Sequence, residues 1–229
     1  MAQLELLSAG AVKPGLVHVI EAFQQKTGHK VDVTFATAPE IRKLIGGGAT
    51  ANVVVAPPQL LDDLVKAGKA TGERVMVGRI GVGVMVREGT PLPKIATVDE
   101  LRQSLLEADS VVYNHASTGI YLETLFARLG IAAQLKTKTT RYPDAAAVLD
   151  HVSKGKKKEI GFGATTVIVE GQSKGLVFVG PLPAEIQNYT TYAAMMTADG
   201  AAANAAREFL DYLATDAAKA ILAEAGIQT

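Results

Sequence analysis

Cysteine is absent from this chain of 229 residues, which excludes disulfide bonds, thiolate metal sites and a cysteine nucleophile. Long apolar runs are absent too: none reaches the roughly 18 residues needed to span a membrane, so we expect no membrane insertion. An excess of charge of either sign is also missing, since 23 basic residues balance 23 acidic ones. Nucleic-acid-binding proteins usually carry a basic excess, and we therefore predict no nucleic-acid partner.

The first seven residues lack the features of a secretion signal. They contain no basic segment and no long apolar core, so we interpret them as the first strand of the fold. Two locations are compatible with this start. The chain as written is cytoplasmic, and it is periplasmic if a leader peptide was removed and a methionine added.

What is present is a repeating alternation of strand and helix patterns in a chain that is 48% hydrophobic and 20% charged. This alternation predicts an α/β fold with mainly parallel sheets flanked by helices on both faces. The length suits one large domain or two lobes of roughly 100 residues each. We expect strands at 4–7, 31–35, 52–56, 75–87, 110–114, 135–142, 160–163, 176–179 and 188–196. Among the expected helices are 97–107, 120–129, 144–153, 201–213 and 216–225.

Three strand-to-helix turns have small residues in common. Small residues let the backbone approach a ligand closely, and the helix behind each turn offers free N–H groups and the positive end of its dipole. Because ligands of open α/β sheets bind beyond the carboxyl ends of strands, these turns predict an anion cradle. An ordinary helix cap is the alternative interpretation of each turn taken singly. The candidate ligand-binding residues are Ser8, Gly10 and Ala11, then Thr37 and Ala38, and finally Ser117, Thr118 and Gly119.

Helix-start motifs accompany two of the expected helices. Thr37-Ala38-Pro39-Glu40 and Thr97-Val98-Asp99-Glu100 both match a capping box, in which the threonine and glutamate side chains each bond the other residue's backbone N–H. Both motifs therefore predict a helix that begins at the threonine.

Titratable residues near the third turn are the candidates for chemistry. His115 follows the strand at 110–114, and an imidazole can carry a proton near neutral pH, so it is the candidate catalytic residue. Tyr121 is a candidate ligand-binding residue and, with Glu40, an alternative base. Arg141 could hold a carboxylate through two hydrogen bonds, or be a solvated arginine at a strand end. Lys13 and Arg42 are further cationic candidates, and the remaining histidines show no metal-ligand spacing, so we expect neither a metal nor a cofactor.

The order of elements resembles the molybdate-binding protein group of the type II periplasmic binding proteins. The resemblance covers nearly the whole chain and includes Leu7-Ser8-Ala9-Gly10, Phe35-Ala36-Thr37, Asn52-Val53-Val54-Val55 and Phe209-Leu210-Asp211-Tyr212-Leu213. It implies a two-lobed fold with the ligand in a cleft between the lobes. Lobe 1 would comprise residues 1–80 and 185–229, and lobe 2 residues 81–184. The crossings would lie near 77–84 and 181–192.

The chain departs from that group where the group's hydroxyls hold a tetrahedral oxyanion. Ala11 replaces a first-turn serine, Ala38 stands where a second serine is expected, and Ala164 appears where a late tyrosine belongs. Each lost donor would leave a buried oxygen unpaired, at a cost of about 1–3 kcal/mol. Molybdate or tungstate is therefore the less favoured ligand.

A branch of the same superfamily is more similar, namely aconitate isomerase and its relatives. The matching segments are Val111-Val112-Tyr113, Ala116-Ser117-Thr118-Gly119-Ile120-Tyr121-Leu122-Glu123, Arg128-Leu129-Gly130-Ile131 and Phe178-Val179-Gly180. This resemblance implies an organic di- or tricarboxylate as ligand. We expect a monomeric solute-binding protein, served by an ABC permease if it is exported. The alternative is a cofactor-independent isomerase that moves the double bond of aconitate by a proton shift.

Overall fold

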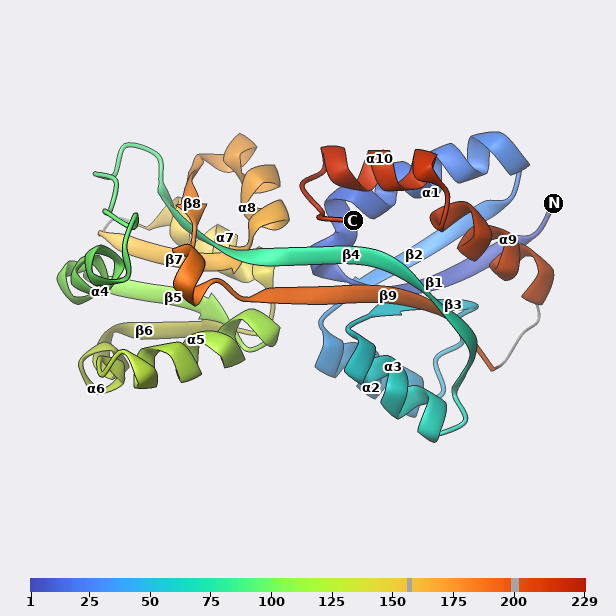
Figure 1. Ribbon diagram of the computed structural model, residues 1–229, viewed down its shortest axis with the longest axis horizontal. Coiled ribbons are helices and arrows are strands. Elements are labelled where there is room, and N and C mark those ends of the chain that lie inside the picture. Colours follow the sequence, from blue (N-terminus) through green and yellow to red (C-terminus); the bar gives the residue numbers. More distant parts are fainter. Residues whose placement is uncertain (156–157, 199–201) are drawn as a thin grey trace. The chain divides into compact units, whose positions relative to one another are not determined.

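The chain folds into two compact units, which the strands β4 (Ala70–Arg87) and β9 (Tyr189–Thr197) both connect. The structure is a computed structural model that describes residues 1–155, 158–198 and 202–229. Unit 1 consists of Met1–Ile80 and Thr191–Thr229, and unit 2 of Gly81–Thr190. Each unit contains its own group of paired strands and its own helices (Figure 1).

Within unit 1 the strand order is β2-β1-β3-β9, which is part of a nine-stranded sheet. The strands β1 (Gln3–Ala9), β2 (Lys30–Ala36) and β3 (Val53–Ala56) are parallel, and β9 runs antiparallel to β3. Helix α1 contacts α9 and α10, whereas α2 contacts α3 and β1 (Figure 1). The helices are α1 (Lys13–Thr27), α2 (Ala38–Gly46), α3 (Pro58–Lys66), α9 (Ala203–Leu213) and α10 (Asp216–Glu224).

Apolar periodicity accounts for the long first helix of unit 1. In α1, Leu16, Val19, Ile20 and Phe23 recur at helical spacing, and all four are buried. Gly28 ends the helix with φ = 71°, a left-handed conformation that suits glycine, and its N–H donates to the carbonyl of Gln24 at 2.9 Å. The apolar stripe of α1 therefore packs into the interior of unit 1, and a backbone hydrogen bond caps the C-terminus of the helix.

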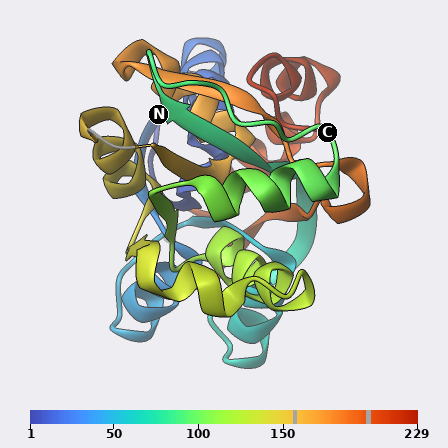
Figure 2. The same cartoon turned by 90° about the vertical axis from the view of Figure 1, so that its left-hand side faces the viewer.

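Within unit 2 the strand order is β4-β7-β5-β6, with β8 also paired to β4. Strands β5 (Ser110–Asn114), β6 (Thr139–Tyr142) and β7 (Glu159–Ala164) are parallel, and β4 runs antiparallel to both β7 and β8 (Leu176–Pro181). Figure 2 looks onto this unit, with α4 next to the α5–α6 pair. The helices are α4 (Val98–Glu107), α5 (Ser117–Arg128), α6 (Ala132–Leu135), α7 (Ala145–Lys154) and α8 (Thr165–Gly171).

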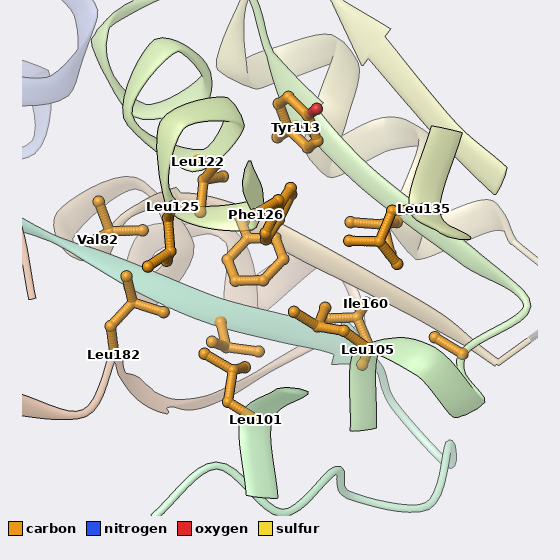
Figure 3. Close-up of a cluster of buried hydrophobic side chains, with 14 of the residues drawn as sticks. Val82, Leu101, Leu105, Tyr113, Leu122, Leu125, Phe126, Leu135, Ile160 and Leu182 are labelled. Atoms are coloured by element: carbon orange, nitrogen blue, oxygen red, sulfur yellow. The ribbon is translucent and has the colours of Figure 1, made fainter. Parts of the chain in front are cut away.

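Strand alternation divides the interior of unit 2 into two cores. Successive residues of a strand face opposite sides of the sheet, so Val84 and Val86 pack against α4, α5 and α6, whereas Met85 packs against α7 and α8. In the first core Phe126 lies among side chains from several elements (Figure 3). Burying one such large side chain contributes about 1.5–3 kcal/mol.

Short polar contacts hold β4 on both sides of the boundary at Ile80–Gly81. In unit 1, the backbone of Arg79 exchanges two hydrogen bonds with Gln228, at 2.8 and 3.0 Å. In unit 2, the side-chain amide of Gln187 accepts from the N–H of Val82 at 2.9 Å and donates to its carbonyl at 3.0 Å. Each unit thus anchors its own part of the connecting strand.

Two sequence-based assignments in unit 2 need correction. The strand expected at 135–142 is confined to β6, because residues 132–138 are helical and Leu135 packs into the first core. Helix α8 has no counterpart among the elements expected from the sequence, and its segment Thr-Thr-Val-Ile-Val is rich in β-branched residues, which favour strands. Val167 and Ile168 are buried in the second core, so tertiary packing overrides this propensity.

The other expected helices occur, with small shifts at their ends. The capping box at Thr97 forms: Thr97 Oγ1 accepts from the N–H of Glu100 at 3.2 Å, and the Glu100 carboxylate accepts from the N–H of Thr97 at 3.3 Å. Of the closing helix expected at 201–213, Ala201 lies outside the described residues, and α9 covers the remainder from Ala203. None of the described helices is long and apolar enough to cross a membrane.

Candidate functional site

The first candidate turn of unit 1 joins β1 to α1 through a short 3₁₀ segment at Gly10–Val12. Ser8 is fully buried near the end of the strand, and within the described chain its hydroxyl bonds only the neighbouring carbonyl of Ala9, at 3.3 Å. A Cβ added at Gly10 would meet no atom within 4 Å, so the turn is open at this point. No side chain of the described residues caps this turn or α1.

The second turn joins β2 to α2 and emerges beside the first. Ser8 pairs with Phe35, and Ala9 with Ala36, in the parallel register of β1 and β2, so the two turns leave the same edge of the sheet. Thr37 and Ala38 are half-buried there. The ammonium of Lys13 lies 6.0 Å from the Phe35 ring centroid, which brings a cation to this edge.

The capping box predicted at Thr37 does not form. Thr37 occupies the N-cap position with an extended backbone, but within the described chain its side chain makes no capping bond. The motif specifies residue types and not the χ1 rotamer of the threonine, on which the bond depends. The first turn of α2 therefore keeps backbone N–H donors at Ala38 and Glu40, while Pro39 has none to offer.

The third turn lies in unit 2 between β5 and α5. Asn114 ends the strand and is 7% exposed, and its Oδ1 accepts from the N–H of Ala116 at 3.0 Å. Ala116 is the N-cap of α5, and none of the described side chains caps this helix. Ser117 and Thr118 are half-buried at its first turn. The third predicted turn thus also presents an uncapped helix N-terminus, with two hydroxyls beside it.

Gly119 has a packing role that the sequence does not reveal. A Cβ at this position would overlap the carbonyl oxygen of Asn114 and lie 3.0 Å from Cδ2 of Tyr113. The absence of a side chain at Gly119 therefore lets α5 approach the end of β5, whereas the space at Gly10 is open. The two glycines, which look equivalent in the sequence, differ in their surroundings.

His115, the candidate base, lies exposed between β5 and α5. Its backbone N–H donates to the carbonyl of Tyr142 at 2.8 Å, which fixes the main chain. Its imidazole has no hydrogen-bond partner within the described part of the chain. The ring is therefore accessible, but no neighbouring side chain orients it.

Three of the other candidates are committed to protein contacts. Arg141 forms an ion pair with Glu123, its guanidinium carbon lies 5.5 Å from the Tyr113 ring centroid, and its side chain is 27% exposed. Arg141 is thus partly exposed, with Glu123 as its counter-charge. Tyr121 donates to the carbonyl of Ile186 at 2.5 Å, and exposed Arg42 pairs with Asp63 at 2.7 Å in unit 1.

Tyr113 is the group in this region with a shifted pKa. Burial raises the pKa of Tyr113, and the nearby carboxylate of Glu123 raises it further, while Arg141 opposes both effects. The phenol consequently stays protonated well into the alkaline range, and it does not serve as a base near neutral pH.

Two polar features were missed from the sequence. The first is the side chain of Asn114, which could have been recognised because an asparagine before a turn commonly bonds the backbone two residues later. The second is a chain in which Tyr142 Oη lies 2.7 Å from Nδ1 of His151 and Nε2 of His151 lies 3.2 Å from Glu159. Its members come from β6, α7 and β7, so no sequence spacing could have shown it. Among the described residues, no cluster of three metal-ligating side chains occurs.

Known proteins are similar to this chain in sequence and in fold. The family model for bacterial extracellular solute-binding proteins matches residues 4–228. The chain belongs to this family. An aconitate isomerase from Pseudomonas sp. is 32% identical over 226 residues, covering 95% of this chain and 85% of that protein.

Solved structures support the fold of this family member. The periplasmic molybdate-binding protein of Azotobacter vinelandii superposes with a TM-score of 0.81 at 19% identity, over 99% of both chains. The sulfate-binding protein SubI of Mycobacterium tuberculosis H37Rv superposes with a TM-score of 0.78 at 18% identity, over 99% of this chain and 86% of that one. The two-lobed α/β fold class and the family predicted from the sequence are therefore confirmed.

Proposed function

We propose that this solute-binding protein binds a small organic di- or tricarboxylate. The observation that carries the proposal is the chemistry of the three turns: each presents a helix N-terminus that no described side chain caps. Such termini favour anions through their N–H groups and their dipoles. Ser8, Thr37, Ser117 and Thr118 add hydroxyl donors beside them.

The alanines at three positions favour an organic anion over a tetrahedral oxyanion. Ala11 and Ala38 lie in the two turns of unit 1, and Ala164 is the N-cap of α8 in unit 2. A methyl group offers no hydrogen bond, so a small inorganic oxyanion would lose about 1–3 kcal/mol for each hydroxyl that it needs and does not find. A carboxylate ligand can instead place carbon against these methyl groups. The aconitate isomerase at 32% identity supports this choice, since its name implies a tricarboxylate substrate.

Thermal unfolding with added ligands tests the proposal. Citrate, cis-aconitate and trans-aconitate should each be compared with molybdate and tungstate at equal concentration. A ligand at about 100 times its Kd stabilises the native state by about 2.7 kcal/mol. For a chain of this size that energy corresponds to a Tm increase of roughly 5–10 °C. A larger increase with molybdate than with any carboxylate would contradict the proposal.

A point substitution links the effect to the proposed turns. Thr118→Ala removes a hydroxyl and leaves the backbone of α5 intact, so it should weaken carboxylate binding roughly 10-fold or more, as expected for a hydrogen bond to a charged group. Thr124 is a matched control, because its hydroxyl bonds the carbonyl of Ile120 within the same helix, and Thr124→Ala should leave the affinity unchanged.

Isomerisation of aconitate is the second candidate function. The observation in its favour is the 32% identical aconitate isomerase, together with the accessible imidazole of His115 beside α5. The reaction removes a proton from one carbon and returns it to another, and a histidine can carry that proton. Incubation of pure protein with trans-aconitate, followed by NMR detection of the cis isomer, tests it. The absence of conversion at high protein concentration would eliminate this function.

His115→Ala identifies the base if conversion occurs. This variant should abolish turnover while binding persists, and His18→Ala, which removes another exposed histidine in unit 1, should keep full activity. Full activity in His115→Ala would show that His115 is not the base.

An additional role as receptor for an ABC permease requires export, and the start of the unprocessed gene decides whether a leader exists.

A further inference from the structure

Asn114 is a buried polar residue whose side chain lies at the N-terminus of α5. Its Oδ1 is 3.0 Å from the backbone nitrogen of Ala116, the N-cap residue. A backbone N–H can only donate, so the atom facing it must be the amide oxygen. This single contact therefore determines which way the amide of Asn114 points.

The nitrogen of that amide has no hydrogen-bond partner among the residues that the structure describes. No residue in the described chain accepts a hydrogen bond from Nδ2 of Asn114, although the residue is only 7% exposed. Among the described residues, four side-chain atoms have neither solvent access nor a hydrogen-bond partner: Arg87 Nε, Thr90 Oγ1, Arg141 Nε and Glu159 Oε2. Because Nδ2 is not one of them, it retains access to solvent. The residue is buried overall, yet this donor is neither bonded within the described chain nor shut off from solvent, so it is available to a ligand at this turn.

We propose that Asn114 is a ligand-binding residue whose Nδ2 donates to an ionised carboxylate at the first turn of α5. The inference rests on the proposed carboxylate-binding function. Nδ2 carries two N–H donors and no acceptor. The backbone N–H groups at the start of α5, which no described side chain caps, can likewise only donate. All these groups require an acceptor, so the subsite selects an ionised carboxylate and rejects a neutral group that must donate.

Asn114→Asp tests the contribution of the Nδ2 donor while the rest of the side chain is kept. Aspartate keeps an oxygen for the N–H of Ala116 and has nearly the same size, so the turn should survive and the Tm without ligand should equal that of the wild type. The donor, however, becomes a negatively charged acceptor. Citrate and trans-aconitate, titrated calorimetrically at pH 7.5, should bind about 100-fold more weakly or not at all.

Asn52 provides a matched control in unit 1. Its Oδ1 accepts from the N–H of Glu5 at 2.8 Å, which is the same kind of bond, and it lies in neither of the candidate turns of that unit. Asn52→Asp makes the same change in net charge. Its affinity for citrate should stay within threefold of the wild type.

Asn114→Ala distinguishes a ligand contact from a structural role. A ligand contact predicts that affinity falls in the order Asn, Ala, Asp, because alanine only loses the donor whereas aspartate also repels the anion. A structural role predicts the reverse for the two variants, because aspartate preserves the bond to Ala116 and alanine does not. The second order, or wild-type affinity in Asn114→Asp, would overturn the inference alone. Wild-type protein that binds neither acid would overturn the proposed function, and the inference with it.

Discussion

Gly119→Ala and Gly10→Ala form a pair of substitutions that should change stability in opposite directions. Both glycines lie in small-residue turns between a strand and a helix, and neither has a positive φ. From propensity alone, Gly→Ala within a helix stabilises by about 1 kcal/mol, and α5 begins two residues before Gly119. The sequence therefore predicts that Gly119→Ala is stabilising.

The structure predicts the opposite sign for Gly119. The added Cβ would overlap the carbonyl oxygen of Asn114, 2.9 Å from the carbonyl carbon and 3.0 Å from Cδ2 of Tyr113. Backbone and a buried ring cannot yield easily, so α5 must shift and disturb the packing of Phe126. Overpacking of this kind costs about 3 kcal/mol, and after the gain in propensity a net loss of about 2 kcal/mol remains.

At Gly10 an added Cβ meets no atom within 4 Å. Gly10→Ala should therefore be neutral or stabilise by up to about 1 kcal/mol, through the reduced freedom of the unfolded chain. Differential scanning calorimetry should show the Tm of Gly119→Ala lowered by roughly 4–8 °C and that of Gly10→Ala unchanged or slightly raised. Gly119→Ala with wild-type stability would refute the close approach of α5 to β5.

Three further predictions concern the stability of the fold. Thr97→Ala should lower the free energy of unfolding in urea by about 1 kcal/mol, because its capping bond is lost. Thr37→Ala should change it by less than about 0.5 kcal/mol, because Thr37 makes no such bond within the described chain. An equal loss in both variants would be inconsistent with the structure. Gly78→Ala should lower the free energy of unfolding by at least about 2 kcal/mol in the same assay. The φ of Gly78 is 139°, and an added Cβ would lie 2.6 Å from the carbonyl oxygen of Gln228. Retained stability would contradict this contact. Burial raises the pKa of Tyr113 in the folded protein above the ordinary tyrosine value of about 10. At pH values above about 10, unfolding therefore releases a proton from this phenol, and the free energy of unfolding should fall as the pH rises. Tyr113→Phe should lessen this fall when urea curves at pH 9 and pH 10.5 are compared, and an unchanged slope would exclude the effect.

Much of the fold could be predicted because its signals are local. The burial pattern of β3, the apolar stripe of α1 and the capping box at Thr97 each depend on residues within a few positions of one another. Helix α8 could not be predicted in this way. Its β-branched sequence favours a strand, and its helical state depends on burial of Val167 and Ile168 against distant elements.

The positions of the three candidate turns were predictable, but the contacts of their side chains were not. The carboxyl ends of parallel strands are known binding edges, so the turns after β1, β2 and β5 could be recognised from the order of elements. The state of Arg141 could not, because Glu123, eighteen positions away, neutralises its charge. The network around His151 was missed for the same reason.

The sequence by itself determined the α/β alternation, the family and the three small-residue turns, because periodicity and turn chemistry act over short stretches of chain. Only the tertiary structure decided which side chains at those turns are available. It showed that Gly119 is needed for packing whereas Gly10 faces open space, and that the amide nitrogen of Asn114 has no partner within the described chain. The physical reason is that the partner of a side chain, and the space around a Cα, depend on atoms brought close by packing, whose positions no local pattern encodes.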